Sequence, residues 1–241
     1  MDAYTDDLAY IHDVGFGDFA RGAAPGLLDI LRHRGITQGL VVDLGCGSGL
    51  WAQVLTEAGF DVLGIDQSVA MLAMARQRVP HGVFHTGSFL HADLPSCVAM
   101  TALGEVFNYQ FDGRNSMHQL NRLFRRVYTA LQPGGLFIFD IATPGRGTGP
   151  RLRCREGADW VVLIDVEEEQ TARRLTRRIT FFRKVGELYR RGHETHVLQL
   201  YTRSDMATAL RHVGFLVRTL HAYGQYPLLK GCAGFVARKP A

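Results

Sequence analysis

The first 142 residues alternate between two hydrophobic patterns. Short, nearly continuous apolar runs, typical of strands buried on both faces, are separated by stretches with apolar residues at helical spacing. The apolar runs are residues 40–44, 61–66, 81–86, 96–103 and 136–141, and the helical stretches are 50–58, 69–79 and 117–131. Strands that alternate with helices predict a parallel sheet covered on both faces. We therefore expect an α/β fold with a doubly wound sheet.

The pattern changes after residue 142. Residues 143–157 are rich in glycine, proline and arginine, which is typical of a mobile loop. From 160 to 201 the chain has β character without helices between, which predicts two or three antiparallel strands with Gly186 at a hairpin turn. The remaining expected elements are a helix from its N-cap at Ser204 to Val213 and two closing strands, 215–223 and 232–239.

These patterns divide the chain into three parts. The expected parts are an N-terminal lid and helix over residues 1–35, a core over 36–142 and 202–241, and an inserted loop and antiparallel β cap over 143–201. In the first part, a short helix that Gly15 and Gly17 break should precede a second helix with Pro25 near its start.

Composition places the chain among ordinary globular proteins. Of its 241 residues, 46% are hydrophobic and 21% are charged. No apolar run approaches the roughly 20 residues of a membrane span, so no membrane partner is expected. The N-terminus lacks the layout of a signal peptide, so a cytoplasmic location is expected. The four cysteines are too widely spaced for a metal site or a disulfide framework, so no bound metal is expected. The formal charge of +4 permits an anionic substrate but does not itself argue for nucleic acid.

A glycine-rich loop joins the first strand to the next helix. Residues 43–49 read Asp-Leu-Gly-Cys-Gly-Ser-Gly. Glycines allow a tight turn and a close approach of the backbone to a ligand, and N–H groups at a helix start favour anionic or polar groups. The dinucleotide-binding fingerprint requires glycine or alanine where this chain has Leu50, and here the third glycine comes one residue early, at Gly49. A tight turn without a ligand is the structural alternative.

This loop and two further motifs resemble those of the class I S-adenosylmethionine-dependent methyltransferases. The loop is similar to motif I of that family, and Asp66 ends the second strand about 20 residues later, where a ribose-binding acid belongs. Leu-Gln-Pro-Gly-Gly at 131–135 resembles the turn before the family's fifth strand, and residues 104–109 are loosely similar to the glycine N-methyltransferase group. The resemblance implies a Rossmann-like seven-stranded sheet, mostly parallel with an antiparallel last strand, and S-adenosylmethionine as cofactor.

The resemblance also implies a set of cofactor-binding residues. Asp66 would accept hydrogen bonds from both ribose hydroxyls, with an acid at a helix N-terminus as the structural alternative. Arg21 is a candidate partner of the methionine carboxylate or an ordinary surface charge, and Met71 packs on adenine or in the core. Ser88 takes the adenine-recognition position, where an amide or acid is more familiar. The full set is Arg21, Asp43, Leu44, Gly45, Cys46, Gly47, Asp66, Gln67, Met71, Ser88, Phe89, Leu103, Gly104 and Glu105.

Methyl transfer needs alignment of the nucleophile, exclusion of water and, for some acceptors, removal of a proton. The catalytic candidates are His12, in an aromatic segment able to close over the site, and Glu105, at the carboxyl edge of the sheet. The candidate substrate residues are Tyr4, Tyr10, Phe16, Asn108, Tyr109, His193 and His196, of which the two histidines are also candidate bases. Each histidine has a structural role as its alternative, and an amine or activated-carbon acceptor needs no dedicated base.

The predicted cap is rich in arginine. These side chains are Arg173, Arg174, Arg177, Arg178, Arg183, Arg190 and Arg191. They fit edge protection of solvated strands, an anionic substrate, or RNA. The expected function is methylation of a small metabolite or natural product at N, O or C, with no nucleic-acid partner and with a homodimer formed through the cap. The alternatives are an RNA or protein methyltransferase and a non-catalytic cofactor-binding protein of the same fold.

Overall fold

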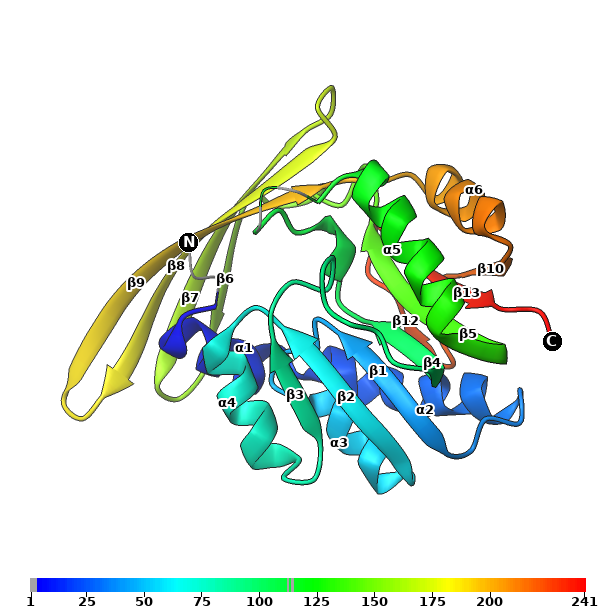
Figure 1. Cartoon of the computed structure of the whole chain (residues 1–241). Coiled ribbons are helices and arrows are strands. Elements are labelled where there is room, and N and C mark those ends of the chain that lie inside the picture. The colour runs from blue at the N-terminus through cyan, green and yellow to red at the C-terminus, as the bar shows by residue number, and fades with distance from the viewer. Residues whose placement is uncertain (1–3, 112, 114) are drawn as a thin grey trace.

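The computed structural model describes residues 4–111, 113 and 115–241, and its main element is a seven-stranded sheet (Figure 1). In spatial order the strands are β10 (Leu216–Leu220), β13 (Cys232–Arg238), β5 (Leu131–Ala142), β4 (Cys97–Ala102), β1 (Gly39–Leu44), β2 (Phe60–Asp66) and β3 (Val83–Thr86). Neighbouring strands are parallel except that β13, the last strand, is antiparallel to both β5 and β10. The predicted sheet is therefore confirmed.

Alternate residues of the strands feed two hydrophobic cores on opposite faces of this sheet. Val42 packs in the core on the face covered by α5 (Met117–Ala130) and α6 (Arg203–Val213), and its neighbour Val41 packs in the other core. The second face is covered by α2 (Asp18–Arg32), α3 (Leu50–Glu57) and α4 (Val69–Arg78). Successive side chains of a strand point to opposite faces, so a strand covered on both is apolar throughout. In the described part of the chain, no helix is long and apolar enough to cross a membrane.

The chain order reverses between β1 and β4. The chain runs outward in one direction through β1, β2 and β3, and in the other through β4 and β5. The loops after neighbouring strands diverge at such a reversal and leave a crevice at the carboxyl ends, where open α/β sheets bind ligands. The glycine loop follows β1, and a short 3-10 helix, η1 (Val106–Asn108), follows β4 at this edge.

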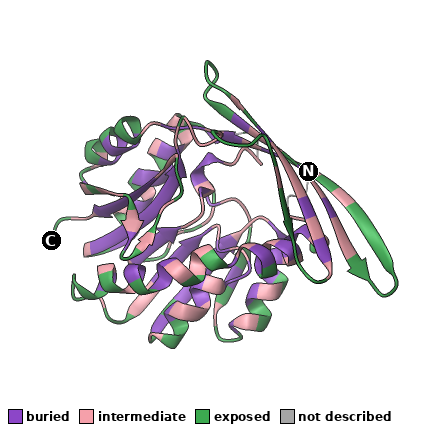
Figure 2. Ribbon diagram, turned by 180° about the vertical axis from the view of Figure 1, so that it is seen from behind, coloured by how far each residue is buried: buried purple, intermediate pink, exposed green. Residues whose placement is uncertain are grey.

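A separate antiparallel sheet forms the predicted cap. Its order is β6 (Leu152–Glu156), β7 (Trp160–Glu169), β8 (Arg174–Val185) and β9 (Leu188–Gln199). The β8–β9 hairpin turns at Gly186, whose φ of 63° is left-handed, and its outer part is exposed (Figure 2). The prediction that residues 152–156 belong to a mobile loop is wrong. They pair with β7 as a mostly exposed edge strand, so their sequence shows little apolar alternation.

The N-terminal helices begin and end at other residues than expected. Residues 1–3 of the predicted lid lie outside the described residues. Gly15 does not break the first helix, because α1 (Asp6–Phe16) contains it and only Gly17 separates α1 from α2. A Cβ on Gly15 would lie 2.7 Å from the Trp160 ring, so this glycine permits close packing of α1 on the cap. Pro25 lies inside α2, which already starts at Asp18.

Side-chain caps begin three later helices. Ser68 accepts a hydrogen bond from the Met71 N–H at 3.1 Å, as predicted for α4. Ser116 starts α5 in the same way, which is also predicted. For α6 the predicted cap, Ser204, is wrong: Thr202 accepts from the backbone N–H of Asp205 at 3.1 Å, because Thr202 has the extended backbone of an N-cap.

Candidate functional site

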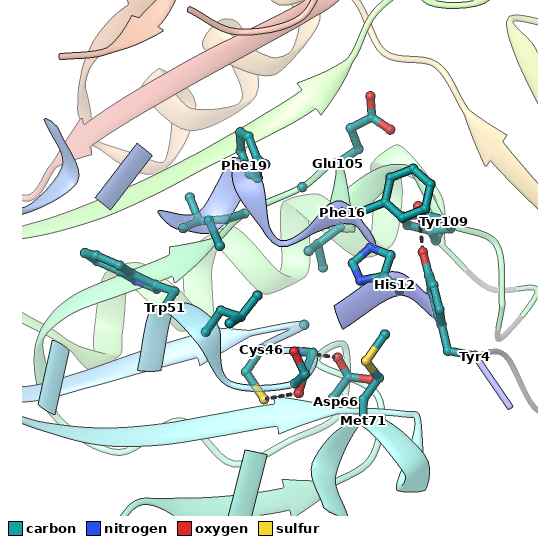
Figure 3. Close-up of a pocket in the computed structure, with 18 of the residues that line it drawn as sticks. Tyr4, His12, Phe16, Phe19, Cys46, Trp51, Asp66, Met71, Glu105 and Tyr109 are labelled. Atoms are coloured by element: carbon teal, nitrogen blue, oxygen red, sulfur yellow. Dashed lines mark hydrogen bonds between the residues drawn. The ribbon is translucent and has the colours of Figure 1, made fainter. Parts of the chain in front are cut away.

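A cavity of about 330 Å³ opens where the strand order reverses (Figure 3). The glycine loop and the ends of β1, β2 and β4 form one wall. The opposite wall comes from Tyr4 and α1, from the segment after β4, and from the cap strand β8. Three parts of the chain that are distant in sequence therefore enclose one space.

Two glycines of the loop have different surroundings. The N–H of Gly45 donates to the Ile65 carbonyl at 2.7 Å, and a Cβ on Gly45 would lie 2.7 Å from Val106. Gly47 has a left-handed φ of 54°, and a Cβ there would meet no heavy atom within 4 Å. The first glycine lets the loop turn tightly against the protein, and the second leaves open space toward the cavity.

Asp66 ends β2 with its carboxylate at the cavity. Its Oδ2 accepts a hydrogen bond from the Gly47 N–H, and its Oδ1 accepts one from the Ser68 N–H, both at 2.9 Å. Burial raises the pKa of Asp66, although these backbone bonds act to lower it. A carboxylate oxygen has more than one lone pair, so the bonds orient the group and leave acceptor capacity for ligand hydroxyls.

Two further carboxylates face the cavity from strands. Asp43 accepts a hydrogen bond from the Thr101 hydroxyl at 2.6 Å, and the Trp51 indole N–H donates to that hydroxyl at 3.2 Å. Burial raises the pKa of Asp43 to about 7. Asp140, on β5, accepts from the backbone N–H of Glu105 at 2.8 Å, and burial raises its pKa to about 6. These acids give this side of the cavity acceptors for ammonium or hydroxyl groups.

Aromatic side chains form the opposite wall (Figure 3). The His12 ring centroid lies 5.0 Å from that of Tyr4 and 5.9 Å from that of Phe16, and Tyr109 stacks on Phe111 at 4.7 Å. The hydroxyls of Tyr4 and Tyr109 are 3.2 Å apart. Burial lowers the pKa of His12 to about 4, so its imidazole is neutral at pH 7 and can accept a hydrogen bond.

Glu105 lines the cavity, but its surroundings contradict its predicted role as a base. Arg177 Nη2 lies 2.7 Å from Glu105 Oε2, and Arg146 Nε pairs with Oε1. Burial alone would raise the pKa of Glu105, but the two arginines outweigh it and lower the pKa to about 2. A carboxylate held by two guanidinium groups is a weak proton acceptor. Glu105 is the counter-ion of a buried arginine pair.

Most of the predicted cofactor and substrate residues line this one cavity. They come from the N-terminal segment, the end of β1 and the glycine loop, the end of β2, the start of α4, the loop after β3 and the segment after β4. The residues brought together are Tyr4, His12, Phe16, Asp43, Gly45, Cys46, Gly47, Asp66, Gln67, Met71, Phe89, Leu103, Gly104, Glu105 and Tyr109.

Three predicted cofactor residues do not line the cavity. Arg21 is exposed on α2, where its guanidinium lies over Gly17. Leu44 is fully buried in the hydrophobic core. Ser88 is next to Phe89, which does line the cavity, but is not itself in the wall. The structure therefore supports none of the three as a direct ligand.

Four predicted substrate residues have other surroundings. The Asn108 amide donates to the Ala142 carbonyl at 2.8 Å and accepts from the Ala142 N–H, so it ties η1 to β5. The ring of Tyr10 packs under Arg183 on the cap. His193 is exposed on β9. His196 is buried behind Tyr4 and bonds to Glu194 at 2.9 Å, so it supports the aromatic wall.

Several cavity residues were not among the predicted site residues, although Arg177 was one of the cap arginines considered for an anionic substrate. Asp140 is preceded by an apolar strand, as Asp43 and Asp66 are, and that pattern could have identified it. Arg177 interrupts the apolar alternation of its strand, which was a weak signal. Arg146 follows a glycine in a segment expected to be a loop, and no local pattern distinguishes it.

The residues of the cavity fit S-adenosylmethionine. Because Gly47 is left-handed and has open space beside it, a ligand can approach the backbone of the loop closely. Asp66 offers carboxylate oxygens as acceptors for the ribose hydroxyls. Asp43 supplies a fixed acid beside the loop, on the side suited to an ammonium group. The buried Met71 and Phe89 line the same wall and provide apolar surface for a base.

Comparisons with known proteins agree with this fit. A family model described as a methyltransferase domain matches residues 41–135. The Bacillus subtilis (strain 168) protein YqeM, which carries the name of a methyltransferase, is 25% identical over 198 residues, or 77% of this chain and 76% of its own.

Solved structures give the same answer for the fold. An S-adenosylmethionine-dependent methyltransferase from Clostridium acetobutylicum superposes with a TM-score of 0.83 over 98% of both chains at 18% identity. An S-adenosylmethionine-bound amino pentose methyltransferase from Micromonospora echinaspora gives 0.78 over 99% of both chains at 20% identity. The chain therefore contains a methyltransferase domain over residues 41–135, with the glycine loop and Asp66 at one cavity, on a fold similar to that of S-adenosylmethionine-dependent methyltransferases.

Proposed function

We propose that the protein transfers the methyl group of S-adenosylmethionine to a small molecule. The observation that carries this proposal is the enclosure of the cavity by lid and cap. Leu8 and Ile11 of α1 pack against Trp160 and Ile179 of the cap, which holds the lid helix across the site. The cavity of about 330 Å³ falls in the range of roughly 300–1,000 Å³ that is usual for small-molecule sites.

The amino pentose methyltransferase of similar fold supports an acceptor of sugar or natural-product size. That protein is involved in calicheamicin biosynthesis. Its likeness to this chain extends over the cap as well as the core, because it covers 99% of both chains. We infer that the cap of this chain also faces a modest acceptor.

The chain's own residues contribute orientation and exclusion of water. S-adenosylmethionine, when bound, supplies a methyl group already activated for transfer. The aromatic wall of Tyr4, His12 and Tyr109 would exclude water and hold the acceptor in line with that group. We propose that the neutral His12 accepts a hydrogen bond from the nucleophile, which suits an acceptor that is nucleophilic without a strong base.

The paired arginines of the cap weigh against RNA as the acceptor. Arg174 pairs with Glu169 at 2.6 Å, and Arg178 pairs with Glu167 at 2.9 Å. Charges neutralised in this way contribute little to phosphate-backbone binding. RNA binding with a steep salt dependence would instead favour the RNA methyltransferase alternative.

Binding of the demethylated cofactor tests the proposal directly. We expect S-adenosylhomocysteine to bind the full chain in calorimetry. Asp66→Asn should weaken this binding by about tenfold to a hundredfold, because hydrogen bonds to a charged group are lost. Asp61→Asn is the matched control, since Asp61 lies exposed on the same strand and should leave the affinity unchanged. Equal affinities in both variants would contradict the ribose role of Asp66.

Turnover separates the remaining alternatives. The protein with labelled S-adenosylmethionine should methylate members of a panel of amines, amino sugars and hydroxylated metabolites. Methylation of RNA or protein alone would overturn the small-molecule proposal. Cofactor binding without turnover on any panel would instead indicate the non-catalytic alternative.

We also propose the division into a lid at 1–35, a core at 36–142 and 202–241, and a cap at 143–201. A homodimer through the cap and a cytoplasmic location belong to the same proposal. The outer part of the β9 edge, away from its bridge to Tyr109, supports the dimer, since an open strand edge offers unpaired backbone groups to a second copy. A monomer in light scattering would contradict it.

A further inference from the structure

Three side chains from distant segments form a buried charge cluster beside the cavity. Glu105 ends the connection after β4, Arg146 follows β5, and Arg177 lies on β8 of the cap. Their side chains are only 8%, 12% and 16% exposed. All three line the cavity on the side of Tyr109, which receives a hydrogen bond from Arg177 Nη1 at 3.2 Å.

The cluster carries more positive than negative charge. Two guanidinium groups share the single carboxylate of Glu105. The other acids of the cavity, Asp43, Asp66 and Asp140, bond to hydroxyl or backbone N–H groups, and among the described residues none pairs with these arginines. A surplus cation at a poorly hydrated wall attracts an anion strongly.

Arg146 has donors to spare. Only its Nε is bonded, to Glu105, and within the described residues its two terminal nitrogens have no hydrogen-bond partner. Guanidinium presents parallel N–H groups that match a carboxylate or a phosphate in a bidentate fashion. The two terminal nitrogens of Arg146 therefore form a preformed binding site for a carboxylate or a phosphate.

The backbone holds Glu105 beside the two arginines. Its φ of 64° is left-handed, which a non-glycine residue rarely adopts, and its N–H donates to Asp140 at 2.8 Å. This conformation directs the carboxylate to both arginines. It keeps them paired when no anionic ligand is present, because an unpaired buried charge is strongly unfavourable.

We propose that the methyl acceptor carries an anionic group, a carboxylate or a phosphate ester, which binds between Arg146 and Arg177 while the acceptor atom faces the aromatic wall. This inference deepens the proposed function and rests on it. It also assigns a role to Glu105, which competes with the anionic group and limits its affinity.

Anion binding by the cofactor-loaded protein is the test. The full chain saturated with S-adenosylhomocysteine is titrated calorimetrically with inorganic phosphate or with acetate, at constant ionic strength set with chloride. We expect saturable binding of one anion per chain. Tighter binding of phosphate would indicate a phosphate ester, and tighter binding of acetate a carboxylate.

Consecutive arginines of β8 supply a matched pair of variants. Arg177→Gln should weaken anion binding by about tenfold or more, because a charge-assisted contact is lost. Arg178→Gln should leave it unchanged, since Arg178 points to the other face and pairs with Glu167. Glu105→Gln should strengthen anion binding, because the competing carboxylate is gone.

A second pair covers the case in which Arg177→Gln fails to fold. Arg146→Gln should lose anion binding, whereas Arg151→Gln, in the same segment but exposed and paired with Asp165, should keep it. The affinity for S-adenosylhomocysteine reports the fold of each variant. No saturable anion binding by the unaltered protein, or equal binding by both members of each folded pair, would overturn the inference.

The two proposals fail in different ways. If S-adenosylhomocysteine does not bind, or only macromolecules are methylated, the small-molecule function fails. If the cofactor binds and a neutral amine is methylated while neither anion binds, only the anionic acceptor fails.

Discussion

At the scale of single residues, Gly47 has a conformation and a surrounding space that point to a ligand. Its φ is left-handed, and the position of a Cβ is open toward the cavity. The sequence predicts that this glycine and Asp66 bind the cofactor, and both line the cavity, because a glycine loop and a strand-end acid depend on local backbone geometry. Arg146 was not predicted, because its role comes from contact with Glu105, a residue distant in the chain.

Gly47→Ala should separate strain from ligand contact. Left-handed backbone with a Cβ costs about 1–2 kcal/mol, so the free energy of unfolding should fall by that amount. Gly35→Ala is the control, since Gly35 has a φ of 72° and equally open surroundings far from the cavity. Both variants should lose similar stability in urea, and only Gly47→Ala should lose S-adenosylhomocysteine affinity. If both variants lost affinity for S-adenosylhomocysteine, backbone strain alone would explain the loss.

At the scale of elements, the lid helix α1 is bound directly to the glycine loop. The buried Asp13 accepts a hydrogen bond from the Ser48 hydroxyl at 2.5 Å and pairs with Arg78 of α4 at 2.9 Å. One acid of the lid therefore connects the loop after β1 to the helix after β2. The apolar spacing of α1 was visible in the sequence, but the close packing of Gly15 against Trp160 of the cap was not.

Asp13→Ala should loosen the lid without unfolding the core. Loss of the buried partner of Ser48 and Arg78 should reduce the free energy of unfolding by about 1–3 kcal/mol. Backbone amides of α1 should exchange hydrogen faster, and S-adenosylhomocysteine should bind more weakly. Asp6→Ala, on the exposed start of the same helix, should change stability by only a few tenths of a kcal/mol. Unchanged exchange in Asp13→Ala would show that packing alone holds the lid.

At the scale of the whole molecule, the buried charge cluster ties the cap to the core. Arg177 comes from the cap, Glu105 from the core, and Arg146 from the connection between them. Both sheets also contribute to the wall of one cavity. The cap and the core therefore should not respond independently to conditions that break this cluster.

Acid should break the buried charge cluster within a defined range of pH. The pKa of Glu105 is lowered from an ordinary 4.5 to about 2, so the unfolded chain takes up the proton first. The stability from this group is complete above about pH 4.5 and is lost as the pH falls toward 2. Glu105→Gln should remove this contribution and cost about 1–3 kcal/mol at pH 7, because both guanidinium groups lose their charged partner.

Urea unfolding at pH 7, 4.5 and 3 measures the effect. The difference in unfolding free energy between the unaltered protein and Glu105→Gln should shrink as the pH falls. Glu187→Gln, at the exposed β8–β9 turn, should show no such trend. A constant difference at all three pH values would mean that the ion pairs do not set the acid response.

The doubly wound sheet, the order of its strands and helices along the chain, and the glycine loop could be predicted from the sequence alone. Each of these features depends on hydrophobic periodicity or on local backbone chemistry, which short stretches such as residues 43–49 contain in full. The wall of the cavity opposite the glycine loop depends on the tertiary structure. That structure placed His193 outside the cavity and Arg177 in it, and it made Glu105 a counter-ion instead of a base. The alternation of a strand determines the face on which a side chain lies, but not the charged group that it contacts. Glu105 contacts Arg146 and Arg177, which lie about 40 and 70 residues further along the chain, so these contacts depend on the tertiary structure.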